Sequence, residues 1–215
     1  MKLAKVGLLI AYPAFALTFR GPRERFWDRM TMTGAVLGTI AIAGDPSLQR
    51  PRLRGRDIAL GLGIAAGLYA IFQLGDRMAR RVLPSGDKNI SDIYELRRIE
   101  PSDRIALRLA IVIGPAEEFF WRGLLQRSLA RRIGRVPAAA ASTVAYGGAH
   151  LVTANPALIG AATVAGLYWS VFAAFGAPMA ALVVSHVAWD VWIFLLAPTG
   201  RHPSPARGEV PTATL

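Results

Sequence analysis

Residues 157–175 read ALIGAATVAGLYWSVFAAF and carry no charged side chain. Two residues later the chain continues over residues 178–197 as PMAALVVSHVAWDVWIFLLA, which is again almost wholly apolar. A helix of about 20 apolar residues is long enough to cross the hydrocarbon core of a bilayer. Because so short a connection allows only antiparallel neighbours, we expect two adjacent membrane-spanning helices here.

Five further apolar runs precede these two. They cover residues 3–19, 31–44, 57–75, 104–129 and 136–152. We therefore predict an all-α fold, a polytopic transmembrane bundle of about seven helices that forms one domain over residues 1–198. The run from Thr31 to Gly44 is short, so whether it spans the bilayer fully is left open. Residues 199–215 form a polar tail with three prolines, which we expect to be disordered.

The composition is typical of a membrane protein. Of the 215 residues, 53% are hydrophobic and 18% are charged, against about a quarter charged in soluble domains. The net charge is +11, but the basic residues lie in short loops beside the apolar runs, where they meet anionic headgroups. We therefore expect a lipid bilayer and no nucleic acid as partner. Alternate loops carry similar totals of Lys and Arg, which leaves the orientation undecided. The absence of cysteine excludes disulfides and cysteine nucleophiles.

Three local patterns predict how the runs are connected and packed. In the longest polar segment, residues 77–103, apolar side chains recur among charged ones at Ile90, Ile93, Tyr94 and Leu96. That spacing predicts a short amphipathic helix on the membrane surface. Gly63 and Gly67 offer a small-residue face for close helix packing. Trp27, in a basic loop, is expected to anchor the membrane interface.

Ionisable side chains inside apolar runs cost a few kcal/mol or more, so they are paired, face a wet cavity or serve a function. The acidic residues well inside these runs are Glu117, Glu118 and Asp190, and they are accompanied by Arg122, His150 and His186. Glu118 and Arg122 are four residues apart and can pair on one helix face. Glu117 is rotated about 100° from Glu118, which leaves it free to point into the bundle as a general acid or base. Tyr146 shares a face with His150, as His186 does with Asp190.

These residues stand in three motifs. The stretch from Glu117 to Arg122, EEFFWR, resembles the EExxxR motif of the CAAX protease and bacteriocin-processing family of glutamic-type intramembrane proteases. The stretch from Tyr146 to His150, YGGAH, resembles the family's FxxxH motif, and the stretch from His186 to Asp190, HVAWD, resembles its HxxxN/D motif. Their order and their places on the fourth, fifth and seventh predicted helices also agree. The resemblance covers a motif-bearing core of about residues 90–197.

The resemblance implies an intramembrane endopeptidase that hydrolyses a peptide bond of a membrane-embedded or membrane-associated polypeptide. It assigns water activation to Glu117 with His150, and stabilisation of the oxyanion to His186 with Asp190. Glu118, Arg122 and Tyr146 are expected to support the site. A protein of this kind is expected in the cytoplasmic, or inner, membrane of a bacterium.

Two positions depart from the family pattern. An ionised Asp190 cannot donate a hydrogen bond to an oxyanion, whereas Asn can, so Asp190 either orients and charges His186 or stays protonated. Tyr146 replaces Phe, and its hydroxyl is within possible reach of the water or of Glu118. Tryptophans are expected only to pack or to lie at the interface, with no chemical role: Trp121, Trp169, Trp189 and Trp192.

Other functions compete with this interpretation. Glu117, His150, His186 and Asp190 are suitable zinc ligands, but no HExxH is present and the family is generally viewed as metal-independent, so we expect no cofactor. A non-proteolytic member of the same fold, acting as a bacteriocin immunity protein or a membrane scaffold, is the main alternative. A proton-coupled carrier would require inverted repeats, which the sequence does not show. Prenylated CAAX proteins, bacteriocin leaders and C-terminal sorting tails all stay open as substrates.

Overall fold

The computed structural model describes residues 2–49, 53–83 and 85–199, and every regular element in these ranges is a helix. The α-helices are α1 (Lys2–Arg20), α2 (Phe26–Gly44), α3 (Gly55–Val82), α4 (Gly86–Tyr94), α5 (Ser102–Arg108), α6 (Gly114–Glu117), α7 (Arg127–Ile133), α8 (Arg135–Ala149), α9 (Pro156–Ala174) and α10 (Met179–Asp190). The π-helical stretches are η4 (Leu109–Ile113), η5 (Glu118–Gln126) and η7 (Val191–Leu196). The all-α prediction is confirmed, and each of the seven predicted runs coincides with a helical segment.

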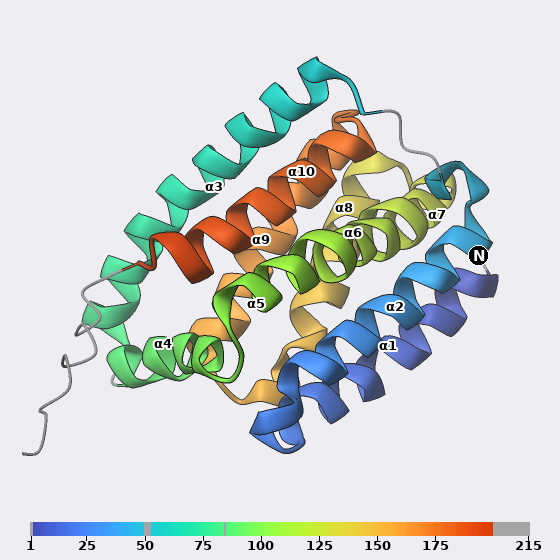
Figure 1. The fold of residues 1–215 in the computed structure, drawn as a ribbon. Coiled ribbons are helices and arrows are strands. Elements are labelled where there is room, and N and C mark those ends of the chain that lie inside the picture. Colours follow the sequence, from blue (N-terminus) through green and yellow to red (C-terminus); the bar gives the residue numbers. More distant parts are fainter. Residues whose placement is uncertain (1, 50–52, 84, 200–215) are drawn as a thin grey trace, which may run out of the picture.

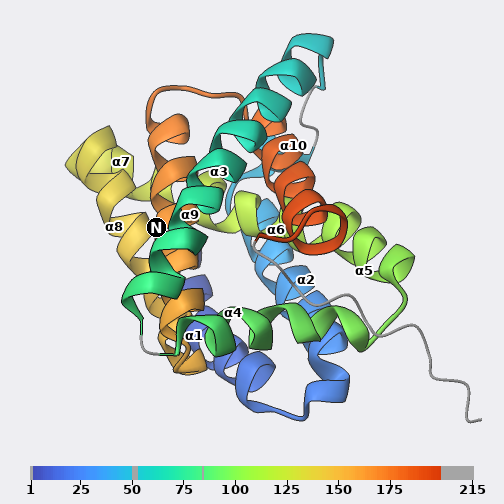
Figure 2. The same cartoon turned by 90° about the vertical axis from the view of Figure 1, so that its left-hand side faces the viewer.

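The helices form a bundle whose centre is one long helix. This helix consists of α5, η4, α6, η5 and α7 in succession. Figure 1 shows α1 beside α2 along one side of the bundle and α3 beside α10 along the other, with the long helix between α2 and α10. Helices α8 and α9 lie together behind it. In Figure 2, α4 crosses one end of the bundle, and the loop between α9 and α10 lies at the opposite end.

Four helical segments of the described residues are long and apolar enough to cross a membrane. They are Lys2–Arg20, Gly55–Val82, Pro156–Ala174 and Met179–Leu196. Large apolar side chains also point outward on several helices, as expected of a surface that contacts lipid: Leu9, Leu17, Ile111, Val144 and Leu196. The run predicted at 31–44 is part of the longer helix α2, which begins at Phe26. It begins earlier because Trp27 and Met30 are buried against the bundle.

Two apolar clusters hold the bundle together. One joins α1, α2, the long helix and α8 around Phe15, Leu37, Phe120 and Trp121. The other joins α3, α9 and α10 around Ile64, Leu68, Trp169 and Leu182. Each cluster contributes side chains to the lining of the cavity described below, and so do residues packed against it.

One predicted local role is wrong, and a second holds for only one of its two residues. Trp27 is buried, and its indole N–H donates to the carbonyl oxygen of Leu96 at 2.9 Å, so it is no interface anchor. On α3, a side chain at Gly63 would meet no atom within 4 Å. The close approaches occur instead at Gly61, against α10, and at Gly67, against the Tyr168 hydroxyl.

The predicted amphipathic helix exists as α4, but its apolar face lies against the protein. Ile90 and Tyr94 are buried, and Ile93 lines the central cavity. The first residue of the predicted tail, Thr199, is also buried, because its backbone N–H and hydroxyl bond to Tyr94 and Asp76. Residues 200–215 lie outside the described residues.

Candidate active site

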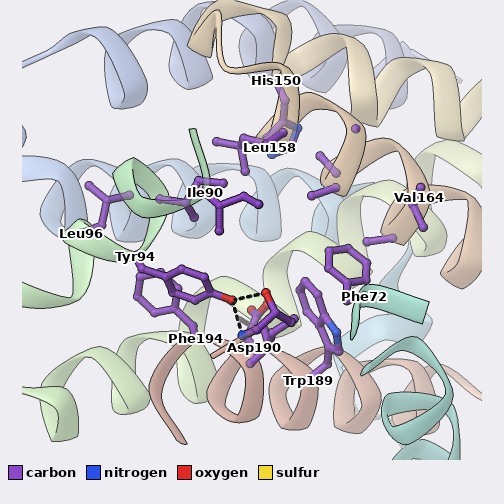
Figure 3. Close-up of a pocket in the computed structure, with 18 of the residues that line it drawn as sticks. Phe72, Ile90, Tyr94, Leu96, His150, Leu158, Val164, Trp189, Asp190 and Phe194 are labelled. Atoms are coloured by element: carbon purple, nitrogen blue, oxygen red, sulfur yellow. Dashed lines mark hydrogen bonds between the residues drawn. The ribbon is translucent and has the colours of Figure 1, made fainter. Parts of the chain in front are cut away.

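The predicted site residues line one cavity of about 460 Å³ inside the bundle. Glu117 comes from the long helix, Tyr146 and His150 from the end of α8, and His186 and Asp190 from α10. In Figure 3, His150 and Asp190 lie on opposite sides of this cavity. The remaining walls are mainly apolar and aromatic, and include Phe72, Ile90, Tyr94, Leu158, Trp189 and Phe194. Glu117, His150, His186 and Asp190, from three different helical segments, therefore line the same cavity.

The two glutamates stand where the long helix changes from α- to π-geometry. Gly114 and Pro115 precede them, and a proline inside a helix removes one backbone donor and loosens the hydrogen-bond pattern. The helix is π-helical from Glu118 onward, a form that is often found at functional sites. As expected, the two carboxylates face different directions: Glu117 lines the cavity, while Glu118 pairs with Arg122. They lie on opposite sides of the His186 ring, Glu118 near Nδ1 and Glu117 near Nε2.

Glu118 lies at the centre of a buried chain of hydrogen bonds. Its Oε1 accepts from Nη1 of Arg122 at 2.8 Å, which confirms the predicted ion pair. The same oxygen contacts Nδ1 of His186 at 2.7 Å. Arg122 also donates through Nη2 to the carbonyl oxygen of Gly166 on α9, at 3.1 Å. Both charged side chains are fully buried, so the pair holds three helices together and fixes one edge of His186.

The contact with Glu118 determines which nitrogen of His186 carries a proton. Because Glu118 is paired with Arg122 and acts as a carboxylate, the Nδ1 of His186 must be the donor. In a neutral ring Nε2 is then an acceptor, and only an imidazolium can donate from it. Nε2 faces the cavity, 3.5 Å from Oδ2 of Asp190 and 3.9 Å from Oε2 of Glu117. Nε2 of His186 can therefore donate a hydrogen bond into the cavity only when the ring is charged.

Glu117 and His150 are connected through Tyr146. The Tyr146 hydroxyl donates to Oε2 of Glu117 at 2.7 Å, so the expected contact with Glu118 is replaced by one with Glu117. The carbonyl oxygen of Tyr146 accepts from Nδ1 of His150 at 2.9 Å, one helical turn later. A carbonyl oxygen cannot donate, so Nδ1 carries the proton and Nε2 of a neutral His150 is left as an acceptor. Such an arrangement suits a group that binds and polarises water.

Two aromatic residues of the site were not predicted from the sequence. Trp169 stacks on His186, with 4.0 Å between ring centroids and 11° between planes, and its indole N–H donates to Ser185. This stacking favours a positive charge on the ring. Phe15 on α1 presents its edge to His150 at 5.1 Å. The first contact joins the consecutive helices α9 and α10, and the second joins α1 to the end of α8; the spacing along a single helix indicates neither of them.

A second polar group at the cavity wall was also missed. Asp76 lines the cavity, pairs with Arg80 at 2.9 Å and accepts from the Thr199 hydroxyl at 3.1 Å. The dashed lines in Figure 3 show Tyr94 bonded to Thr199. The sequence carried a signal for this group, because Asp76 and Arg80 are four residues apart at the end of an apolar run. The predicted run ends at Gly75, whereas α3 continues for seven more residues.

The described residues contain no group of three or more His, Cys, Asp or Glu side chains placed to hold a metal ion. The candidate site consists of one carboxylate bonded to a tyrosine, one histidine with a free Nε2, and one histidine held by a buried carboxylate. A chelation experiment, given in the Discussion, tests the expectation that no metal takes part.

Residues 104–192 match the family model described as "Type II CAAX prenyl endopeptidase Rce1-like". The matched segment contains all three motifs, from Glu117 through His150 to Asp190. No curated protein and no solved structure matches the chain. Together with the four apolar helices, the family match supports an integral membrane protein.

Proposed function

Since residues 104–192 belong to the Rce1-like family of type II CAAX prenyl endopeptidases, we propose that this chain is an intramembrane endopeptidase in which Glu117 activates water. Family membership gives the general kind of function, a membrane protease of the CAAX type. The glutamate chemistry and the roles of single residues are our proposal. One observation carries it: Glu117, His150 and His186 line a single cavity, and the hydrogen bonds of both histidines fix Nδ1 as the protonated nitrogen.

In the first step, Glu117 and Nε2 of His150 bind the attacking water. Glu117 takes one proton from it, and the hydroxide adds to the carbonyl carbon of the scissile peptide bond. The Tyr146 hydroxyl holds Glu117 in place from the opposite side. When the tetrahedral intermediate collapses, Glu117 returns the proton to the leaving amine, so that one water is consumed for each bond broken.

His186 stabilises the negative charge that develops on the carbonyl oxygen. Its Nε2 can donate only when the ring is an imidazolium, and Glu118, Asp190 and the Trp169 ring surround that ring. Arg122 holds the Glu118 carboxylate in place, and Glu118 in turn holds His186 in one orientation through the reaction. Preorganised donors of this kind contribute on the order of a hundredfold to a thousandfold in rate.

The substrate is a polypeptide associated with the membrane. The site is inside the bundle, and its walls are mostly apolar and aromatic, which suits a peptide that carries large apolar groups or a lipid chain. The description of the matched family names prenylated CAAX ends, so a peptide with a C-terminal prenyl-cysteine is the first substrate to test.

The proposed function is tested by comparing the termini of membrane proteins in cells that carry the wild-type chain and in cells that carry Glu117→Gln/His150→Gln. We expect termini that appear only with the wild type and that lie in or beside membrane segments. Exposed Glu95→Gln is the matched control, and it should give the wild-type pattern. Identical termini in all three strains would contradict the proposal. Peptides with and without the prenyl group then define the substrate class.

A further inference from the structure

A second cavity lies at the end of the bundle opposite to α4. Its volume is about 350 Å³, and it lies where α7 ends, α8 begins and the loop of residues 175–178 leads into α10. Figure 2 shows this loop at the opposite end of the molecule from α4. The cavity is lined by Arg122, Arg127 and Arg135 from three consecutive helical segments, and no carboxylate lines it.

Two buried polar side chains of this cavity have an atom without a hydrogen-bond partner in the described part of the chain. They are Nε of Arg122, a donor, and Oε1 of Gln126, an acceptor. Arg122 is 1% exposed and Gln126 is 4% exposed. A buried polar atom left unpaired costs about 1–3 kcal/mol, so a polar group brought to these two atoms would stabilise the protein. A ligand with an anionic group and a hydroxyl would satisfy both.

The charge around the cavity favours an anion. Residues 127–135 contain four arginines and no acidic residue. Nη1 of Arg127 forms an ion pair with Oδ2 of Asp45 at 3.3 Å. Arg135 is exposed and makes no ion pair within the described residues. Helix α8 begins at Arg135 and helix α10 at Met179, and both residues line the cavity. Helix N-termini attract negative charge.

We infer that this cavity binds a phosphate group, and that Arg122, Arg127 and Arg135 hold it while Gln126 accepts a bond from a neighbouring hydroxyl. An anionic lipid headgroup with hydroxyls supplies both, and so does hydrogen phosphate from solution. Basic pockets between helices at the membrane surface have the geometry for such headgroups. The site is distinct from the catalytic cavity, which Arg122 does not line, but Arg122 connects the two through its bond to Glu118.

Binding is tested on the purified full-length chain in bilayer discs of phosphatidylcholine that contain increasing fractions of phosphatidylglycerol. The readouts are the phosphatidylglycerol molecules retained, measured by native mass spectrometry, and the midpoint of thermal unfolding. Arg127→Gln/Arg135→Gln removes two charges from the cavity. The matched control is Arg131→Gln/Arg132→Gln, which removes two exposed charges of the same helix end that do not line it.

We expect the wild type and the control to retain phosphatidylglycerol, and the cavity variant to lose about 25-fold in affinity, at roughly fivefold for each arginine. Arg127→Lys/Arg135→Lys keeps the charge and should restore most of the binding, which separates lost charge from misfolding. A separate arm adds inorganic phosphate to discs of pure phosphatidylcholine. A matching rise of the unfolding midpoint there, lost in the cavity variant, identifies free phosphate as the ligand. A rise with phosphatidylglycerol alone identifies the lipid.

Two results would overturn the inference. If the cavity variant and the control lose binding equally, the basic end attracts anionic membranes as a surface and has no site. If neither phosphatidylglycerol nor phosphate changes the unfolding midpoint or is retained, the cavity binds no phosphate. Neither readout depends on peptide cleavage, so the inference stands or falls separately from the proposed function.

Discussion

At His186, three carboxylates and one indole ring surround a single imidazole. Glu118 is bonded to Nδ1, while Asp190 and Glu117 lie 3.5 Å and 3.9 Å from Nε2. Sequence spacing indicated a purely structural Glu118–Arg122 pair, and the pair is present. The additional bond from Glu118 to His186 gives this carboxylate a second role, because it positions the residue that we propose as the oxyanion donor.

The first prediction concerns that positioning role. Glu118→Gln keeps the size of the side chain but removes the charge that holds His186 and Arg122. We expect kcat to fall about 10- to 100-fold with little change in KM, as expected when a charge-assisted hydrogen bond of about 1.5–3 kcal/mol is lost. The measurement is the single-turnover rate per folded molecule, compared with Glu95→Gln. A normal rate combined with a lower yield of folded protein would show that Glu118 only stabilises the fold.

The second prediction concerns Asp190, where the family pattern also allows Asn. Glu118 already supplies the carboxylate that orients His186, so the negative charge of Asp190 is not required for that purpose. An amide at this position adds a donor for the oxyanion. Asp190→Asn should therefore keep kcat/KM within about tenfold of the wild type, or raise it, a difference of no more than about 1.4 kcal/mol.

Asp190→Ala is the control for this change, because it removes donor and acceptor together, and we expect a larger loss of kcat/KM. The outcome that would contradict the account is a severe loss in Asp190→Asn equal to that in Asp190→Ala. Such a result would mean that the charge on Asp190 is needed to keep His186 as an imidazolium.

At the scale of elements, the contact between α8 and α9 fixes Tyr146. A side chain at Gly166 would come 2.8 Å from Cδ1 of the Tyr146 ring, and the Gly166 carbonyl oxygen accepts from Arg122. The ring is buried and its hydroxyl is bonded to Glu117, so it cannot move without disturbing that bond. The close approach of these two helices therefore sets the position of the proposed base.

The third prediction tests this helix contact. Gly166→Ala should lower the free energy of unfolding by about 1–3 kcal/mol through overpacking, and it should also reduce the cleavage rate. Gly160→Ala is the matched control on the same helix, because its added methyl group would meet no atom within 4 Å. The control should be neutral or up to about 1 kcal/mol more stable, since alanine favours helix over glycine. Equal thermal unfolding midpoints in the two variants would contradict the packing argument.

For the whole molecule, the fourth prediction concerns metal. Among the described residues, no three His, Cys, Asp or Glu side chains are placed to hold a metal ion. The proposed reaction needs only Glu117, His150 and His186. Incubation with phenanthroline, followed by its removal, should leave the cleavage rate unchanged. Loss of activity on chelation, with recovery on addition of zinc, would make these residues metal ligands and would replace the proposed mechanism.

Much of the fold could be predicted because apolar runs and charged loops alternate along the chain. All seven runs coincide with helical segments, and the three motifs meet at one cavity. Spacing along one helix also predicted the Glu118–Arg122 pair correctly. These features depend on local periodicity, or on the need of buried polar groups for partners, and both can be recognised in a sequence.

Individual contacts between helices could not be predicted in this way. Trp169 stacks on His186 and Tyr146 bonds to Glu117, but each partner lies on a different helix. Spacing did predict that Glu117 and Glu118 face different directions, since Glu117 lines the cavity and Glu118 pairs with Arg122. It did not predict that the two carboxylates lie near opposite nitrogens of His186. The buried position of Thr199 was missed because a polar tail gives no sign of its partner Asp76.

The central claim, that Glu117 activates the water, is tested most directly by Glu117→Gln in the purified, reconstituted protein. The amide oxygen can still accept the bond from the Tyr146 hydroxyl, so the variant should fold, with an unfolding midpoint close to that of the wild type. Because glutamine cannot take a proton from water, the single-turnover cleavage rate should fall by more than about a hundredfold. A folded Glu117→Gln protein that cleaves at the wild-type rate would contradict the claim.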